Sequence, residues 1–235
     1  MPGTPARRRP VLSKKPADAN LDVSTEIDIF HNNEAKNYDR STGVYHPSGL
    51  TESACHRELY YDRIGADPVR SNYVSELKLF ALGHYIHDGI QAALLKIFPD
   101  FKSEVRVSLP SLHIEGSADG TTRDWVIELK TVGDATFKTL VRPKKDHVWQ
   151  VHSYMSALGL ARAQLLYINR NTGDTRNFRI KFQPEIWAKI EALIQTIEDA
   201  VAAGEPPIGV DKPYTCRGCK FLRICEPACL QKTPS

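Results

Sequence analysis

The 235-residue chain has no long apolar run, little net charge and only five cysteines. No stretch approaches the roughly 18–20 consecutive apolar residues that a membrane-crossing helix requires. The basic N-terminal stretch is not followed by an apolar segment, so the pattern of a secretory signal is missing. We therefore expect a cytoplasmic protein whose thiols are kept reduced.

The small net charge excludes a protein that binds polyanions over its whole surface. The 31 Lys and Arg residues nearly balance the 28 Asp and Glu residues, which gives +3 at pH 7. Any nucleic-acid-binding surface must therefore be a local patch. The apolar content of 41% and the charged content of 25% are ordinary for a globular protein, and the length suffices for one sizeable core.

Composition divides the chain into four segments. Residues 1–20 are rich in Pro, Arg and Lys and are expected to form a disordered basic tail. Residues 21–72 are expected to be an N-terminal helical segment, 73–203 the main core, and 204–235 a cysteine-rich C-terminal segment. The chain lacks a Gly-x-x-x-x-Gly-Lys-Ser/Thr phosphate loop, which argues against a helicase motor of its own.

Hydrophobic periodicity predicts an α/β fold with a mixed sheet, in the order helix, three strands, helix, strand. The expected helices span residues 50–64, 74–97, 146–160 and 184–203, and the expected strands span 104–109, 112–118, 125–131, 163–169 and 175–182. A turn is expected at 119–122, where an Asp-Gly pair follows the second strand. The helix at 50–64 is expected to carry Cys55.

An acid and a base occur together on the third expected strand. Glu128 and Lys130 are two residues apart and therefore share one face of the strand. The opposite face is expected to point into a core through Trp125, Ile127 and Leu129. Asp119, at the end of the preceding strand, can approach Glu128 across the hairpin. Two carboxylates bind a hard divalent cation, and a neighbouring lysine can stabilise charge on a phosphate. This combination favours metal-assisted phosphodiester hydrolysis over a surface ion pair.

The expected helix at 74–97 offers a further ligand. The imidazole of His87 is a suitable ligand for ions such as Mn²⁺, although a half-buried helical histidine is often only structural. Gly83, one turn earlier, allows another backbone or a substrate to approach closely.

Polar and basic residues also mark the helix after the third strand. Gln150 and Tyr154 are four residues apart and share one helical face, where they either complete a core or act at the site. A basic cluster precedes them and either contacts phosphate or forms a solvated loop. This cluster consists of Arg142, Lys144 and Lys145.

Four motifs in order resemble the PD-(D/E)XK nucleases, specifically the RecB-type branch. They are Gly-x-x-x-His ending at His87, Asp119-Gly120, Glu-x-Lys at Glu128, and Gln-x-x-x-Tyr starting at Gln150. The resemblance covers roughly residues 50–230. One departure is Ala118, which stands where the family often has proline.

The resemblance implies a PD-(D/E)XK, restriction-endonuclease-like core over 73–203 and a role for each matched residue. Asp119, Glu128 and Lys130 correspond to the catalytic set, with Lys130 as the catalytic lysine. The implied ligands of Mg²⁺ or Mn²⁺ are His87, Asp119, Glu128 and the Leu129 carbonyl. Gln150 and Tyr154 are implied to hold DNA or to orient the lysine. Glu104 matches an acid often found at the start of the family's first strand.

Four of the five cysteines lie between 216 and 229 and predict a metal site. A zinc ion bound by Cys216, Cys219, Cys225 and Cys229 suits this spacing, and so does a [4Fe–4S] cluster that uses Cys55 in place of Cys229. One cysteine before the core and Cys-x2-Cys-x5-Cys after it resemble the iron–sulfur nucleases related to the C-terminal part of AddB and to the CRISPR-adaptation nucleases. The resemblance therefore implies a structural [4Fe–4S] cluster held by Cys55, Cys216, Cys219 and Cys225, with Zn²⁺ as the alternative.

These motifs together predict a metal-dependent DNA nuclease. We expect an exonuclease that acts on single-stranded DNA or DNA ends in recombination, repair, or phage- or CRISPR-related DNA processing. A helicase, integrase or recombinase is the expected kind of protein partner. The alternatives are a non-catalytic iron–sulfur module that binds DNA ends in a recombination complex, and a zinc-dependent nucleic-acid binder.

Overall fold

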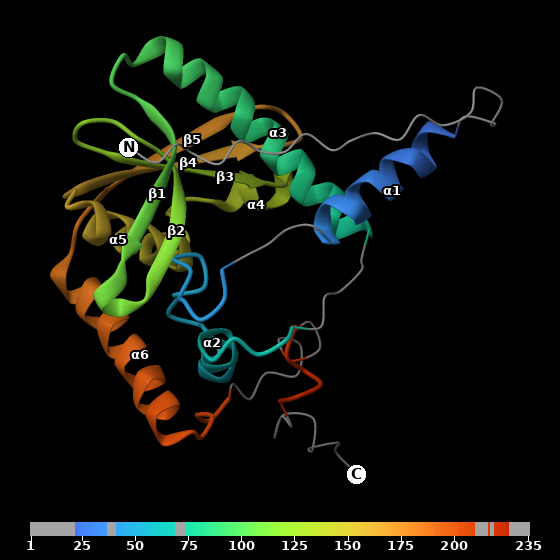
Figure 1. The fold of residues 1–235 in the computed structure, drawn as a ribbon. Coiled ribbons are helices and arrows are strands. Elements are labelled where there is room, and N and C mark those ends of the chain that lie inside the picture. The colour runs from blue at the N-terminus through green and yellow to red at the C-terminus, as the bar shows by residue number, and fades with distance from the viewer. Residues whose placement is uncertain (1–21, 37–40, 69–73, 210–215, 217–218, 226–235) are drawn as a thin grey trace, which may run out of the picture.

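The computed structural model describes residues 22–36, 41–68, 74–209, 216 and 219–225 (Figure 1). The expected tail at 1–20 and Cys229 lie outside these residues. The helices are α1 (Val23–Lys36), α2 (His56–Arg63), α3 (Val74–Ile97), α4 (Asp134–Thr139), α5 (Lys145–Leu158) and α6 (Pro184–Ala203). The strands are β1 (Lys102–Leu109), β2 (Ile114–Thr121), β3 (Val126–Val132), β4 (Arg162–Asn169) and β5 (Thr175–Lys181).

The five strands form one mixed sheet in the order β1-β2-β3-β4-β5. The β3 and β4 strands are parallel, and the other neighbours are antiparallel. Parallel neighbours need a crossover connection, which α4 and α5 supply here. The expected α/β class with a mixed sheet is therefore confirmed. Among the described helices none is long and apolar enough to cross a membrane.

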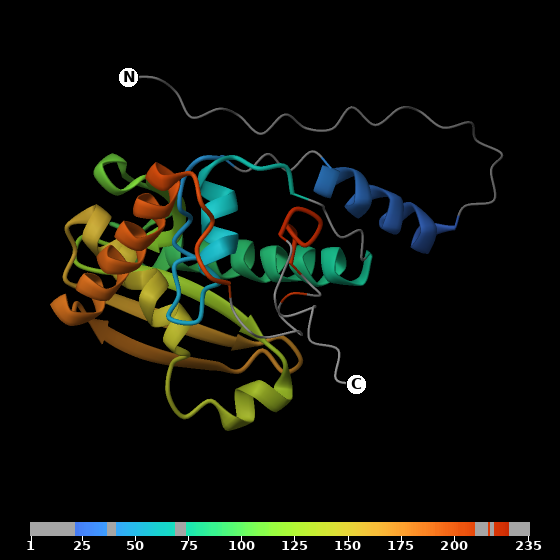
Figure 2. The ribbon, with the colours of Figure 1, turned by 90° about the horizontal axis from the view of Figure 1, so that it is seen from below.

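Helices cover both faces of the sheet (Figures 1 and 2). On one face Ile127 and Leu129 of β3 pack in a buried cluster with apolar residues of α3. On the other face Val126 packs in a cluster with Val151 and Met155 of α5. A strand buried on both faces is apolar almost throughout, and this is the pattern of β3 and β4. Glu128 and Lys130 are the charged exceptions within β3, on the α5 side.

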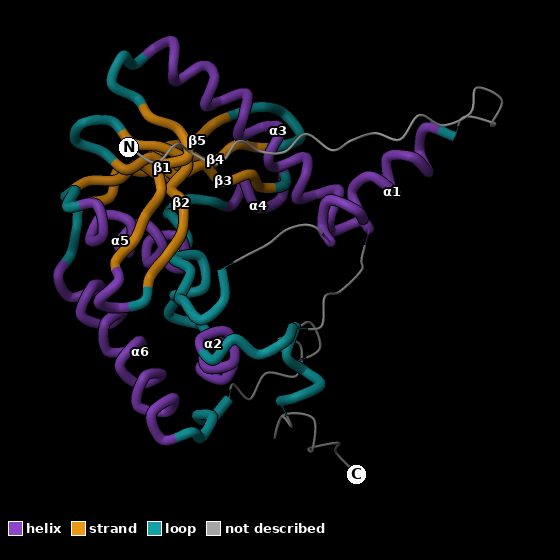
Figure 3. The backbone as a smooth tube through the Cα atoms, in the orientation of Figure 1, coloured by secondary structure: helices purple, strands orange, loops and turns teal. Residues whose placement is uncertain are grey.

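A second core joins segments that are distant in sequence. It contains Tyr60 and Tyr61 of α2, Ile190 and Ile194 of α6, and Phe221 of the C-terminal segment, among other residues. The Tyr61 hydroxyl donates to the Ile224 carbonyl at 3.3 Å, and the Lys220 ammonium lies 2.6 Å from an Asp62 carboxylate oxygen. Figure 3 shows the loop segments that run beside α2. These contacts hold residues 219–225 against α2.

Several element boundaries differ from the expectation. Cys55 is not on the helix expected at 50–64 but immediately before α2, which begins at His56. The turn expected at 119–122 was wrong, because β2 continues through Thr121 to pair with β1 and β3. The turn follows at 122–125. Trp125, expected in the core, lies before β3 and is half-buried, with the Arg162 guanidinium 4.8 Å from its ring centre. The helix α4 was not expected, and α1 lies in the segment 21–72 that was expected to be helical, although no helix was assigned to its residues.

The packing at Gly120 gives a test of the fold. A Cβ at this position would lie 2.3 Å from a Phe101 ring carbon and 3.0 Å from the Lys102 carbonyl oxygen. We expect Gly120→Ala to lower the free energy of unfolding by about 1–3 kcal/mol, the usual cost of overpacking. Gly89→Ala is the control, because Gly89 lies on exposed α3 surface with nothing near its Cβ position. It should raise that free energy by up to about 1 kcal/mol. Urea unfolding that gave equal values for both variants would contradict the packing described.

Candidate active site

The candidate site lies where β2 separates from β3. The two strands pair only at Gly120 with Ile127 and at Thr121 with Val126. Just beyond this short ladder, the Asp119 carboxylate takes the place of a backbone partner and its Oδ2 accepts a hydrogen bond from the Leu129 N–H at 2.6 Å. The N–H and C=O of one strand residue point to the same side, so the Leu129 carbonyl also faces this fork.

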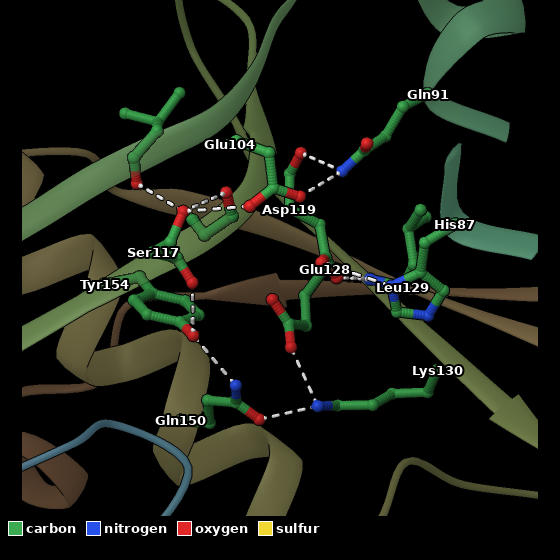
Figure 4. Close-up of polar contacts among 12 residues, drawn as sticks. His87, Gln91, Glu104, Ser117, Asp119, Glu128, Leu129, Lys130, Gln150 and Tyr154 are labelled. Carbon is green, nitrogen blue, oxygen red and sulfur yellow. Dashed lines mark hydrogen bonds and ion pairs between the residues drawn. The ribbon is translucent and has the colours of Figure 1, made fainter. Parts of the chain in front are cut away.

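His87 reaches the same carboxylate from α3. Its Nδ1 lies 3.3 Å from Asp119 Oδ1, and both side chains are about one-fifth exposed, at 20% and 18%. Burial lowers the pKa of His87, but the hydrogen bond and the negative charge of Asp119 outweigh it, and the net pKa is raised. The His87–Asp119 contact thus joins α3 to the fork (Figure 4).

Glu128 is a buried carboxylate that faces a lysine. Its Oε1 lies 2.7 Å from Lys130 Nζ, and the Glu128 side chain is only 4% exposed. Its Oε2 is buried and has no hydrogen-bond partner among the described residues. Burial raises the pKa of Glu128, as does the charge of Asp119, whereas Lys130 and His87 lower it, and the net shift is upward.

A chain of hydrogen bonds fixes the lysine from the other side. The Lys130 ammonium donates to Gln150 Oε1 at 2.8 Å, and Gln150 Nε2 donates to the Tyr154 hydroxyl at 2.9 Å. That hydroxyl in turn donates to the Ser117 carbonyl of β2 at 2.9 Å. Burial raises the pKa of Tyr154, so the phenol stays protonated and able to donate. Lys130 is therefore held in one direction by β3 and α5 together (Figure 4).

The site has the donor set that a hard divalent cation prefers. Asp119 and Glu128 supply carboxylate oxygens, Leu129 a carbonyl oxygen and His87 an imidazole, and the unpartnered Glu128 Oε2 is an acceptor left without a donor. Among the described residues, no three His, Cys, Asp or Glu side chains already converge on a single ion position. In this conformation the Lys130 ammonium takes the other Glu128 oxygen. The chemistry of these donors therefore fits a divalent cation, although in this conformation the side chains do not converge on one ion position.

The basic cluster lies at the start of α5 and is only partly available. Lys145 Nζ lies 2.9 Å from a Glu52 carboxylate oxygen. The Lys144 N–H donates to the Tyr167 hydroxyl at 3.0 Å, and Tyr167 stands opposite Lys130 in the sheet register. Arg142 is exposed. The cluster therefore lies near Lys130 of β3. Within the described residues, no hydrogen bond joins a side chain of the cluster to a site residue.

All four cysteines of the predicted cluster lie within the described residues. Cys55, Cys219 and Cys225 have free thiols. Burial raises the pKa of Cys219, as do the charges of Glu58, Cys55 and Cys225, whereas a hydrogen bond from the Phe221 N–H lowers it, and the net shift is upward. Within the described part of the chain, these cysteines do not converge on a single ion position, so the expected cluster site is not shown. Cys216 is buried and disulfide-bonded, which differs from the thiolate ligand expected from its spacing.

Comparison with known proteins shows the fold. No protein-family model matches the chain, and no curated protein sequence matches it. Among solved structures, SSO0001 is similar with a TM-score of 0.57 and 18% identity, covering 88% of this chain and 98% of that one. The alkaline exonuclease LHK-Exo from Laribacter hongkongensis is similar with a TM-score of 0.54 and 16% identity, covering 69% and 89%. LHK-Exo in complex with dAMP gives the same TM-score at 18% identity. The chain therefore shares its overall fold with these solved structures.

His147 gives a pH test of the packing beside the site. Its Nδ1 lies 2.8 Å from the Tyr167 hydroxyl. Burial lowers the pKa of His147 to about 3, and the charges of Lys130 and Lys144 contribute. In the unfolded chain the His147 imidazole binds a proton near pH 6.5, whereas in the folded chain it stays neutral down to about pH 3. The free energy of unfolding should therefore fall as pH drops from about 6.5 toward 3. His147→Gln should lose less free energy of unfolding between about pH 7 and pH 4.5 than the unmodified protein does. An equal loss of free energy of unfolding in both proteins would contradict the buried environment of His147. The control is His84→Gln, at an exposed histidine of α3.

Proposed function

We propose that the protein is a metal-dependent DNA nuclease, an exonuclease that acts on single-stranded DNA or DNA ends. The observation that carries the proposal is the buried Glu128 carboxylate, which has one oxygen 2.7 Å from Lys130 Nζ and the other without a partner in the part of the chain that the structure describes. Placing a carboxylate there costs free energy, and a cation between it and Asp119 would offset that cost. The shared fold with LHK-Exo, which is an exonuclease, supports the same reading.

His87, Asp119, Glu128 and the Leu129 carbonyl are the residues that would hold Mg²⁺ or Mn²⁺. When bound, such an ion stabilises negative charge on a phosphodiester and lowers the pKa of the attacking water. The Leu129 N–H and His87 orient Asp119 toward the fork before any ion arrives. Preorganisation of this kind avoids rearrangement during the reaction.

Lys130 is the proposed catalytic lysine. Glu128 and Gln150 hold its ammonium at 2.7 and 2.8 Å, at the side of the fork away from α3. An ammonium held there stabilises the charge that develops on the phosphate oxygens and orients the attacking water. Gln150 and Tyr154 act on the reaction through this lysine, because their contacts lead to it and to the β2 backbone.

The proposed substrate path begins at α5. Arg142, Lys144 and Lys145 would contact the DNA backbone, which would make binding dependent on salt concentration. A helicase, integrase or recombinase that presents DNA ends remains the proposed kind of partner.

We further propose a [4Fe–4S] cluster held by Cys55, Cys216, Cys219 and Cys225. Cys55 immediately precedes α2, and Cys219 and Cys225 pack against the second core, to which α2 contributes. Their mutual charge disfavours free thiolates, and a bound metal centre reverses that preference. Reduced Cys216 would supply the fourth ligand. The cluster would then fasten the C-terminal segment to the core, and zinc is the alternative occupant.

Substitution of the central pair tests the proposed activity. Glu128→Gln and Lys130→Met preserve side-chain size and should each reduce Mn²⁺-dependent cleavage of end-labelled DNA by at least about 100-fold. Lys138→Met is the matched control, because Lys138 also lies 2.7 Å from a carboxylate but on exposed surface. The control should cleave at the normal rate. Retention of most activity by folded Lys130→Met would remove Lys130 from the mechanism, and DNA binding without cleavage by the unmodified protein would favour a non-catalytic end-binding role.

The absorption spectrum of anaerobically purified protein tests the cysteine site. We expect a broad band near ~400 nm and bound iron, both lost on Cys55→Ser. A colourless protein that holds one zinc ion and is unchanged by Cys55→Ser would contradict the cluster and indicate a local site in the C-terminal segment.

A further inference from the structure

The ladder between β1 and β2 is interrupted beside the candidate site. Regular pairing continues on both sides of Glu104 and Asp119, which stand opposite each other in register without forming a pair. Glu104 has φ of 50°, in the left-handed region that disfavours residues with a side chain. The backbone of β1 therefore departs from regular β geometry opposite the residue that supplies the Asp119 carboxylate.

At the interruption, the side chains of β2 change the face of the sheet on which they lie. Residues two apart in a regular strand lie on the same face. Ala118, however, lies in the cluster on the α5 face, whereas Gly120 packs against Phe101, which belongs to the cluster on the α3 face. Asp119 lies at the reversal. Without its ladder partner, the Asp119 backbone needs another contact to fix its position.

Gln91 of α3 supplies that contact. This residue is only 5% exposed, and its Nε2 donates to the Asp119 carbonyl at 2.9 Å. The same Nε2 donates to Glu104 Oε1 at 2.9 Å, and Glu104 Oε2 accepts from the Ser117 hydroxyl at 3.3 Å. One buried amide thus bridges the two residues that fail to pair, as Figure 4 shows. A buried amide with both contacts made is strongly directional, because water cannot replace either partner.

Gln91 and His87 act from one face of α3. They are four residues apart, so their side chains lie one above the other on the helix. Asp119 is held at three points: its carbonyl by Gln91, its Oδ1 by His87 and its Oδ2 by the Leu129 N–H. Two of these contacts orient the carboxylate, and the Gln91 contact fixes the backbone from which the carboxylate extends.

We propose that Gln91 is a positioning residue that sets the metal affinity of Asp119 by bridging the interrupted ladder. The inference rests on the proposed function, since it concerns the same cation site. Gln91 touches neither the cation nor the substrate in this account. It holds Asp119 and Glu104 in the strained arrangement that aims the carboxylate into the fork.

Gln91→Met tests the proposal, because methionine is similar in length and unbranched but cannot donate a hydrogen bond. Isothermal titration calorimetry with Mn²⁺ alone, without DNA, should show affinity about 10- to 100-fold weaker than that of the unmodified protein. Cleavage should require correspondingly more Mn²⁺ for half-maximal rate, and saturating Mn²⁺ should restore most of the maximal rate. A purely structural role would lower thermal stability without changing the Mn²⁺ affinity of the folded protein.

Gln195→Met is the matched control. Gln195 lies on exposed α6, where its Nε2 donates to Asp199 Oδ1 at 2.7 Å, so the variant also loses one glutamine hydrogen bond. Its Mn²⁺ affinity should be unchanged. Equal Mn²⁺ affinity in folded Gln91→Met and the unmodified protein would overturn the positioning role. The proposed function would fail instead if the unmodified protein bound no Mn²⁺, or if Glu128→Gln bound Mn²⁺ as well as the unmodified protein does. The two failures are therefore distinguishable.

Discussion

The hydrogen bond from the Leu129 N–H to the Asp119 carboxylate is the contact on which the candidate site depends. It stands where β2 leaves β3, and it allows the sheet to open without an unpaired N–H in the interior. The opening is what gives two carboxylates access to one space. A regular five-stranded sheet would direct the backbone groups of Leu129 into a neighbouring strand and leave no gap for a cation.

The burial of charge around this fork explains why both Glu128 and Gln150 contact the Lys130 ammonium. Glu128 is almost fully buried, and its attraction to Lys130 compensates only part of the cost of removing both charges from water. Gln150 and Tyr154 extend the network to β2, so that the lysine cannot relax away from the carboxylate. The remaining unsatisfied oxygen of Glu128 is the kind of strain that natural proteins retain at functional sites rather than in ordinary cores.

Much of this arrangement was predictable from local rules. The spacing of Glu128 and Lys130 placed both on one face of a strand, and the four-residue spacing of Gln150 and Tyr154 placed both on one side of α5. The Asp-Gly pair at 119–120 led to a wrong prediction of a turn, because such pairs are typical of turns. Pairing with β1 instead extends β2 to Thr121. Gln91 carried no sequence signal, since a helical glutamine usually lies on the surface and its role here arises from an interruption in a distant ladder. The helix α4 is too short for periodicity to reveal.

The central claim is that Asp119, Glu128 and the Leu129 carbonyl together form a cation site. The most direct measurement is a crystal structure of the protein grown with Mn²⁺, with anomalous diffraction recorded at a wavelength where manganese scatters strongly. The account predicts one strong peak in the fork, within coordinating distance of at least one oxygen from each of these three residues. A map with no manganese in the fork, or with manganese bound only at the surface, would contradict it.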